Sequence, residues 1–269
     1  MSFVMGAIVP HPPIIIPEVG GSETKKVAKT IRGLEQLADD IMKIKVDTLL
    51  FTSPHSPYDY ETFLIDNNAT LEGTLSSFGH PEIGFKVDED EVLSEKIING
   101  SRDLGVSLSK RGAYNDKGKG FLDHGITVPY YFISKQRDYK ITSISISGLP
   151  LNDHYELGKV IGRASEKSDK RIAFIASGDL SHGLKSDAPA GFAERGEEFD
   201  RVVVEKIRDG KIKELKDMEG DLINKAAECG LRSFVILAGA LDGRGYDSRI
   251  RSYEGPFGVG YLVAGMRIR

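Results

Sequence analysis

The chain has 269 residues, with 36 Lys and Arg against 40 Asp and Glu, six His, one Cys and no Trp. A chain of this length buries a full core without cross-links, and a single Cys excludes an intramolecular disulfide and a cysteine-based zinc site. The net charge of −4 excludes a polybasic nucleic-acid binder. The first residues carry no basic leader and no apolar run is long enough to span a membrane. We therefore expect a cytoplasmic protein that binds neither nucleic acid nor membranes.

Apolar residues along the chain predict alternating strands and helices. Short β-branched runs favour buried strands, whereas apolar residues spaced by three and four favour amphipathic helices. In chain order the predicted elements are a strand over Phe3–Val9, a helix over Ser22–Lys45, a strand over Thr48–Ser53, a helix over Glu89–Leu104, a strand over Ile141–Ser147, a helix over Asp153–Ser168, a strand over Ile172–Ser177, helices over Gly191–Asp209 and Asp221–Leu241, and strands over Arg249–Glu254 and Val259–Ile268. Ser22 and either Asn152 or Asp153 are the expected N-caps. The helix over 221–241 is expected to break near Gly230.

Strands that alternate with helices are typical of an α/β fold. We predict one domain over residues 1–269, with a central mixed β-sheet flanked by helices on both faces. The last two strands are expected to form a hairpin around Gly255 and Pro256, which makes the sheet mixed rather than purely parallel.

Histidines follow several of the predicted strands, where open α/β sheets bind their ligands. His11, His55 and His182 begin such loops, and His124 lies just before an apolar stretch. Each of these four is flanked by Pro or Gly. A single loop histidine is more often a surface or capping residue, but four at one rim favour a site. Imidazole is the commonest metal ligand and also transfers protons near neutral pH. His80 and His154 are expected to be structural or solvated.

A third metal ligand has three candidates. Glu228 lies in a small, apolar segment, where a buried carboxylate needs a partner such as a cation. An ordinary solvent-facing position is the alternative for Glu228. Cys229 offers a soft thiolate, although a lone Cys is usually a core residue. Glu254 is the weakest candidate of the three.

Two histidines and one carboxylate form the facial triad of non-haem Fe(II) oxygenases, which leaves positions open for substrate and O₂. The same ligands also suit a zinc hydrolase that activates a bound water. Spacing does not choose between them, because the HExxH pattern is absent. The P-loop, dinucleotide-binding and GxSxG patterns are absent as well.

Five short motifs occur in order along nearly the whole chain: PHPP at 10–13, TSPHSP at 52–57, DHG at 123–125, SGDLSHG at 177–183 and ECG at 228–230. In this order and at these strand ends, they resemble the class III extradiol ring-cleavage dioxygenases (LigB-like catalytic subunits), a family that includes a Memo-like branch. The resemblance implies a LigB-like domain and cleavage of a catechol-like or aminophenol-like ring with O₂.

The resemblance also implies roles for individual residues. The implied ligands of Fe(II), or of zinc or another divalent metal, are His11, His55 and Glu228. His182 would be the acid/base that takes a proton from the substrate hydroxyl, with Asp179 orienting its imidazole. His124 would contact the substrate or oxygen beside the metal.

The ECG motif differs from the pattern of the dioxygenases and also from that of the Memo-like branch. The Memo-like branch has Cys-Gly where the dioxygenases have the ligand Glu, and this chain has both residues. If the Cys is the equivalent residue, Cys229 replaces Glu228 as a ligand. The protein would then bind a metal or another ligand without ring cleavage.

We expect the loops Tyr58–Tyr60 and Tyr114–Phe121 to line the pocket. A homodimer is expected because dimers are the commonest oligomers.

Overall fold

The computed structural model describes residues 2–112 and 120–269, so most of the loop expected over 114–121 lies outside the described residues. The strands are β1 (Phe3–Val9), β2 (Thr48–Ser53), β3 (Phe63–Asp66), β4 (Thr70–Leu75), β5 (His80–Asp88), β6 (Leu108–Arg111), β7 (Gly120–Phe121), β8 (Lys140–Ser145), β9 (Ile172–Ser177), β10 (Tyr246–Glu254) and β11 (Tyr261–Ile268). The α-helices are α1 (Pro17–Gly20), α2 (Ala28–Lys43), α3 (Glu91–Leu104), α4 (His124–Ile133), α5 (Leu151–Glu166), α6 (Gly196–Arg208), α7 (Gly220–Asn224) and α8 (Leu231–Ala240).

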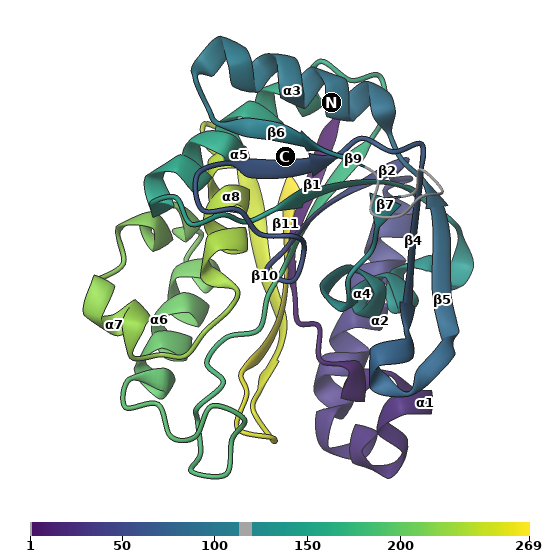
Figure 1. Cartoon of the computed structure of the whole chain (residues 1–269). Coiled ribbons are helices and arrows are strands. Elements are labelled where there is room, and N and C mark those ends of the chain that lie inside the picture. The colour runs from purple at the N-terminus through teal and green to yellow at the C-terminus, as the bar shows by residue number, and fades with distance from the viewer. Residues whose placement is uncertain (1, 113–119) are drawn as a thin grey trace.

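The central sheet of the described chain has eight strands in the order β10-β11-β1-β9-β2-β8-β3-β6 (Figure 1). The four middle strands, β1, β9, β2 and β8, are parallel to one another, whereas β11 and β3 pair antiparallel to this group. Because parallel strands end on one side, the loops after β1, β9 and β2 emerge next to each other. The predicted mixed sheet is confirmed.

Both faces of the sheet are buried, since alternate residues of each middle strand enter different apolar clusters. In β9, Phe174 belongs to the first cluster and Ile175 to the second. The first cluster includes side chains from α3, α5, α6 and α8, and the second includes side chains from α2 and α4. Helices therefore cover both faces, as predicted (Figure 1).

A second, three-stranded sheet has the order β5-β4-β7 and was not predicted. It lies beside α4 (Figure 1), and its inner residues Leu71 and Leu75 pack into the second apolar cluster. In the part of the chain that is described, no helix is both long and apolar enough to cross a membrane.

The predicted N-caps are wrong. The carbonyl of Pro150 accepts hydrogen bonds from the backbone N–H groups of Asp153 and His154, so α5 begins at Leu151 and Asn152 and Asp153 lie inside its first turn. Ser22 lies in a 3₁₀ helix over Gly21–Val27, and α2 begins only after it.

Candidate metal centre

The ends of three neighbouring parallel strands bring the predicted site residues together. Val9, at the end of β1, pairs with Ser177 of β9, and Ala176 pairs with Thr52 of β2. His11, Asp179 and His55 each follow two residues after the end of one of these strands. The order of the strands in the sheet therefore places three loops at one edge, as expected for a ligand site in an α/β fold.

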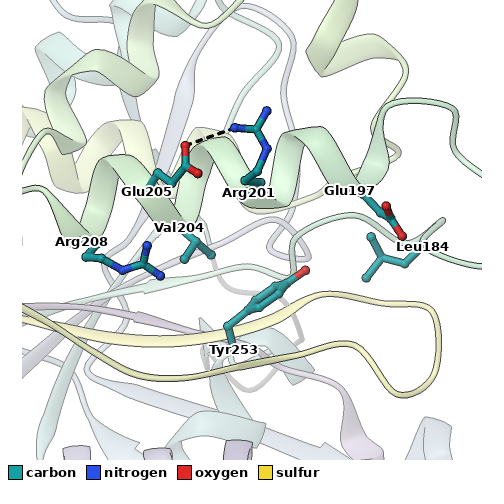
Figure 2. A pocket seen from close by; sticks show the side chains of 7 residues that line it. All are labelled: Leu184, Glu197, Arg201, Val204, Glu205, Arg208 and Tyr253. Carbon is teal, nitrogen blue, oxygen red and sulfur yellow. Dashed lines mark hydrogen bonds and ion pairs between the residues drawn. The ribbon is translucent and has the colours of Figure 1, made fainter.

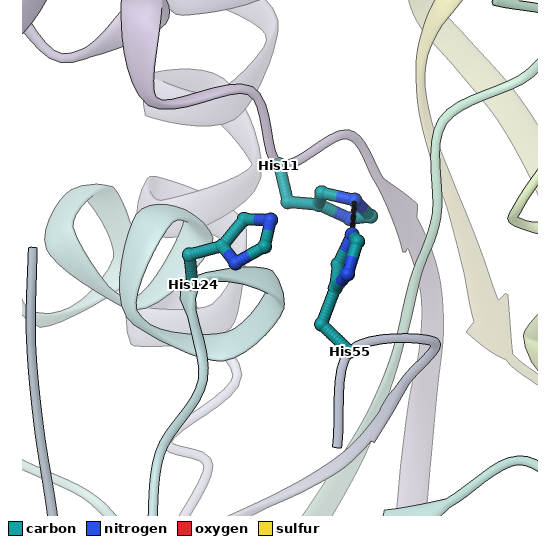
Figure 3. A group of neighbouring side chains, drawn as sticks. All are labelled: His11, His55 and His124. Carbon is teal, nitrogen blue, oxygen red and sulfur yellow. Dashed lines mark hydrogen bonds between the residues drawn. The ribbon is translucent and has the colours of Figure 1, made fainter. Parts of the chain in front are cut away.

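His11, His55 and His124 form a compact cluster at this edge (Figure 3). Each offers one ring nitrogen, and these three atoms lie within 4.8 Å of one another. Nε2 of His11 lies 3.0 Å from Nε2 of His55, and the rings of His55 and His124 are 3.9 Å apart between centroids. His124 was expected beside the metal ligands, whereas the structure places it within the same group as His11 and His55.

Asp123 joins the segments that carry His55 and His124. Its buried carboxylate accepts hydrogen bonds from the hydroxyls of Ser53 and Ser56 at 2.6 and 2.7 Å. It also accepts a bond from the backbone N–H of Gly125 at 2.7 Å, which caps the first turn of α4. One carboxylate thus ties the loop after β2 to the helix that begins with His124.

His11 is held from the β9 side. Its backbone N–H donates to Oδ1 of Asp179 at 3.0 Å, and its Nδ1 lies 2.9 Å from the Ser177 hydroxyl. Both partners belong to the SGD segment at the end of β9. The imidazole of His11 is almost completely buried, so these contacts determine its orientation.

The imidazoles of the cluster favour their neutral form. Burial lowers the pKa of His11 well below its usual value, and the neighbouring imidazoles lower it further. Burial also lowers the pKa of His55, and it lowers the pKa of His124 to about 4. Neutral imidazoles have free lone pairs, which is the state that binds a metal ion.

His182 and Asp179 face each other beside the cluster. Nδ1 of His182 lies 3.0 Å from the carbonyl oxygen of Ala227, to which it donates, and its Nε2 lies 3.9 Å from Oδ2 of Asp179. Burial lowers the pKa of His182 and raises the pKa of Asp179 to about 7. The pair can therefore hold or exchange a proton near neutral pH.

Cys229, rather than Glu228, faces His11. The sulfur of Cys229 lies 3.8 Å from Nε2 of His11 and accepts a hydrogen bond from the backbone N–H of Asp179 at 3.3 Å. Oε2 of Glu228 instead accepts a bond from the backbone N–H of Leu231 at 2.6 Å, at the start of α8. Burial raises the pKa of both side chains, most strongly that of the Cys229 thiol.

The chain around ECG is a turn rather than a continuous helix, because α7 ends at Asn224 and α8 begins at Leu231. Ala227 adopts a positive φ of 52° within this turn. Gly178 packs directly against Gly230. A Cβ atom added to Gly178 would lie only 2.2 Å from the Cα of Gly230. This close approach places Cys229 beside the SGD segment.

The remaining candidates lie outside the cluster. Glu254 accepts hydrogen bonds from the backbone and hydroxyl of Thr30, and His80 contacts Glu82. His154 is buried, with Nδ1 3.0 Å from the carbonyl of Pro150. A groove of about 360 Å³ contains none of the site histidines (Figure 2); it is lined by Leu184, Glu197, Arg201, Val204, Glu205, Arg208 and Tyr253. The sequence predictions also missed Ser177 and Asp123, although both belong to motifs that had been singled out.

The donor set fits a divalent transition metal. Three neutral imidazoles converge, and a thiol lies beside one of them, which is a set of nitrogen and sulfur donors suited to zinc or iron. Oδ2 of the buried Asp179 carboxyl group lies 4.0 Å from Nε2 of His11 and adds an oxygen beside these donors.

The fold and this cluster define an α/β protein with a candidate metal centre at the carboxyl edge of its parallel strands. Residues 5–264 match the family described as the catalytic LigB subunit of aromatic ring-opening dioxygenase. The match covers nearly the whole chain, so the protein belongs to the LigB family. The resemblance inferred from the five motifs is confirmed.

The relatives of this chain include a dioxygenase and a MEMO1 family protein. A protein of Clostridium acetobutylicum is 35% identical over 95% of this chain, which spans only 56% of that relative's length. The chain is 25% identical to 3,4-dihydroxyphenylacetate 2,3-dioxygenase of Escherichia coli, over 92% of this chain and 93% of the enzyme. It is also 23% identical to a MEMO1 family protein of Methanococcoides burtonii, over 78% of this chain and 83% of that protein.

Proposed function

We propose that the protein is a metal-dependent, extradiol-type dioxygenase that opens a catechol-like or aminophenol-like ring with O₂. The observation that carries this proposal is the convergence of His11, His55 and His124 beside the pair formed by His182 and Asp179. The similarity to a ring-opening dioxygenase supports the same reaction class. His11 and His55 would hold Fe(II), together with a third ligand from the ECG turn.

Proton transfer falls to His182 in this proposal. When bound, Fe(II) would supply a chelation point for the two adjacent substrate heteroatoms and a route by which electrons of the deprotonated substrate reach O₂. Nδ1 of His182 donates to Ala227, so its Nε2 is free to accept the proton of a substrate hydroxyl. Asp179 stabilises the imidazolium that results, since its Oδ2 lies 3.9 Å from that nitrogen. His124 keeps a neutral nitrogen directed into the cluster.

The direct test is oxygen consumption. Protein loaded anaerobically with Fe(II) is mixed with O₂ and a panel of catechols and aminophenols, and uptake is followed together with absorbance of the ring-opened product. We expect His182→Gln to lose at least 100-fold in rate while retaining Fe(II). His80→Gln, which changes a histidine outside the cluster, is the matched control and should keep the wild-type rate. Absence of uptake across the panel with iron bound would refute the proposal.

A Memo-like protein that binds metal without ring cleavage is the second candidate. The position of Cys229 beside His11, with Glu228 engaged at the start of α8, favours this alternative. It predicts stoichiometric metal binding, no oxygen uptake with any member of the panel, and no effect of His182→Gln on metal affinity.

A further inference from the structure

Phe78 lies at the tip of the β4–β5 hairpin, in a 3₁₀ turn over Ser76–Phe78. Its side chain is 41% exposed, although it is large and apolar. The centroid of its ring lies 5.0 Å from that of His124, with an angle of 65° between the ring planes. The hairpin tip therefore exposes an aromatic surface directly beside the histidine cluster.

The position of this ring is determined by the backbone of the small sheet. Gly79 adopts a φ of +83°, and its N–H donates to the carbonyl of Ser76 at 3.0 Å, which closes the turn after Phe78. The N–H of Leu122 donates to the carbonyl of Glu72 at 2.9 Å, so β4 is bonded to the chain two residues before His124. The hairpin and the segment that leads to His124 are thus joined by backbone hydrogen bonds.

The exposed tyrosines of the loop after β2 are arranged differently from Phe78. Tyr58 and Tyr60 contact each other at 5.2 Å between ring centroids. Among the described residues, Phe78 is the only exposed aromatic side chain whose ring contacts an imidazole of the cluster.

We propose that Phe78 forms one wall of the substrate site and gives it a preference for planar aromatic rings. This inference rests on the proposed function, since it concerns how the same site holds its substrate. A ring that reaches the cluster would meet the exposed face of Phe78, and aromatic pairs gain from stacked or edge contacts beyond the area they bury. The contact with His124 also restricts the movement of that imidazole. Because the phenyl ring of Phe78 can neither transfer a proton nor bind a metal, Phe78 acts on specificity rather than on the chemical step.

The experiment measures binding without turnover. Protein loaded with Fe(II) is titrated anaerobically with 4-nitrocatechol, whose visible absorption changes on chelation. Phe78→Ala is expected to weaken binding about tenfold, whereas Phe78→Tyr, which keeps the ring, stays within about twofold of wild type. Leu104→Ala removes an exposed apolar side chain from the end of α3 and should bind as wild type. Affinity for Fe(II), measured by competition with a chromophoric chelator, should be the same in all four proteins.

Three results would overturn the inference. If the wild type binds 4-nitrocatechol and Phe78→Ala binds it equally well, Phe78 is not a wall, and the proposed function stands. If the iron-loaded wild type does not bind the catechol, both proposals fail. If Phe78→Ala loses Fe(II) affinity in proportion to catechol affinity, the residue supports the metal centre rather than the substrate.

Discussion

The hydroxyl of Ser177 lies 2.9 Å from Nδ1 of His11 and donates its own hydrogen to the carbonyl oxygen of Gly125 at 2.5 Å. Because a serine hydroxyl has a single hydrogen, Ser177 must accept one from Nδ1 of His11. Nε2 of His11 then keeps its lone pair and faces Nε2 of His55. A serine at the end of β9 therefore selects which nitrogen of His11 is free to bind a cation.

Ser177→Ala should therefore weaken metal binding. Without the hydroxyl, His11 loses the partner that determines its tautomer, and losses of about 10- to 100-fold are typical when such a partner is removed. Competition titrations with a chromophoric chelator measure the change. Ser143→Ala is the matched control, because Ser143 is a buried strand serine whose hydroxyl has no partner among the described residues. Equal affinity in Ser177→Ala and wild type would contradict this assignment.

Cys229→Ser and Glu228→Gln should separate the two candidates for the third ligand. We expect Cys229→Ser to lower cobalt affinity at least tenfold and to abolish a thiolate-to-cobalt charge-transfer band in the near ultraviolet, because the thiol faces His11. Glu228→Gln should bind cobalt as wild type does. Its stability should equal or exceed that of the wild type, because burial raises the pKa of Glu228 and so disfavours the charged form that the amide replaces. The reverse pattern, with cobalt lost only in Glu228→Gln, would identify the carboxylate as the ligand.

Asp123→Asn should affect both stability and the metal centre. The amide cannot accept all three hydrogen bonds that the carboxylate receives, and we expect a cost of about 2 kcal/mol in urea unfolding together with weaker metal binding. Asp90→Asn is the control, because Asp90 is also buried and accepts bonds from a hydroxyl, a backbone N–H and a lysine, but at the start of α3. The control should lose similar stability with unchanged metal affinity. Equal effects of the two variants on metal affinity would argue against the role of Asp123.

His154 should make stability depend on pH below neutrality. Burial lowers its pKa in the folded protein to about 4, from a usual value of 6.5. The unfolded chain therefore binds a proton that the folded chain refuses, and stability falls as the pH drops from about 6.5 to 4. We expect this loss of stability to amount to about 3 kcal/mol. Urea unfolding at several pH values should show a smaller loss on acidification for His154→Gln than for wild type. Parallel curves would contradict the prediction.

Glu89 should have an effect of the opposite sign. Burial raises its pKa to about 8, and its Oε2 has no hydrogen-bond partner among the described residues. The folded chain keeps the proton of Glu89 to a higher pH than the unfolded chain does. Ionisation of Glu89 therefore destabilises the fold as the pH rises from about 4.5 to 8. Glu89→Gln should gain stability relative to wild type across that range, by an amount on the order of 2 to 4 kcal/mol at pH 8. A difference in unfolding free energy that does not change with pH would contradict the assignment.

The sequence was most informative where a strand is buried on both faces. The predicted strands Phe3–Val9, Thr48–Ser53 and Ile172–Ser177 coincide with β1, β2 and β9. Such strands appear as continuous apolar runs with clear ends, so the residues that follow them can be located. This is why His11 and His55 could be assigned to one edge of the sheet.

The small sheet could not be predicted in the same way. β5 is largely exposed, and it contains Pro81 and Gly84, which are usually depleted in strands. The small sheet is held in place by packing against α4, and a local sequence pattern does not reveal such packing. Phe78 consequently could not be placed near the site from the sequence.

The choice between Glu228 and Cys229 also depends on tertiary structure. The pattern suggested a helix broken near Gly230, whereas the backbone already turns at Ala227 with a positive φ. An alanine in that conformation has no sequence signal, since positive φ is usually taken by Gly or Asn. The directions of both side chains follow from this turn.

The parallel order of β1, β9 and β2 has a consequence for folding. His11 is separated from Asp179 by 168 positions in the chain and from Cys229 by 218. Contacts between such distant segments form slowly, because a long loop must close before they contribute. A partly folded chain that has formed its helices would still lack the cluster. In refolding experiments, recovery of metal binding should therefore coincide with the slowest phase, after helical circular dichroism has returned.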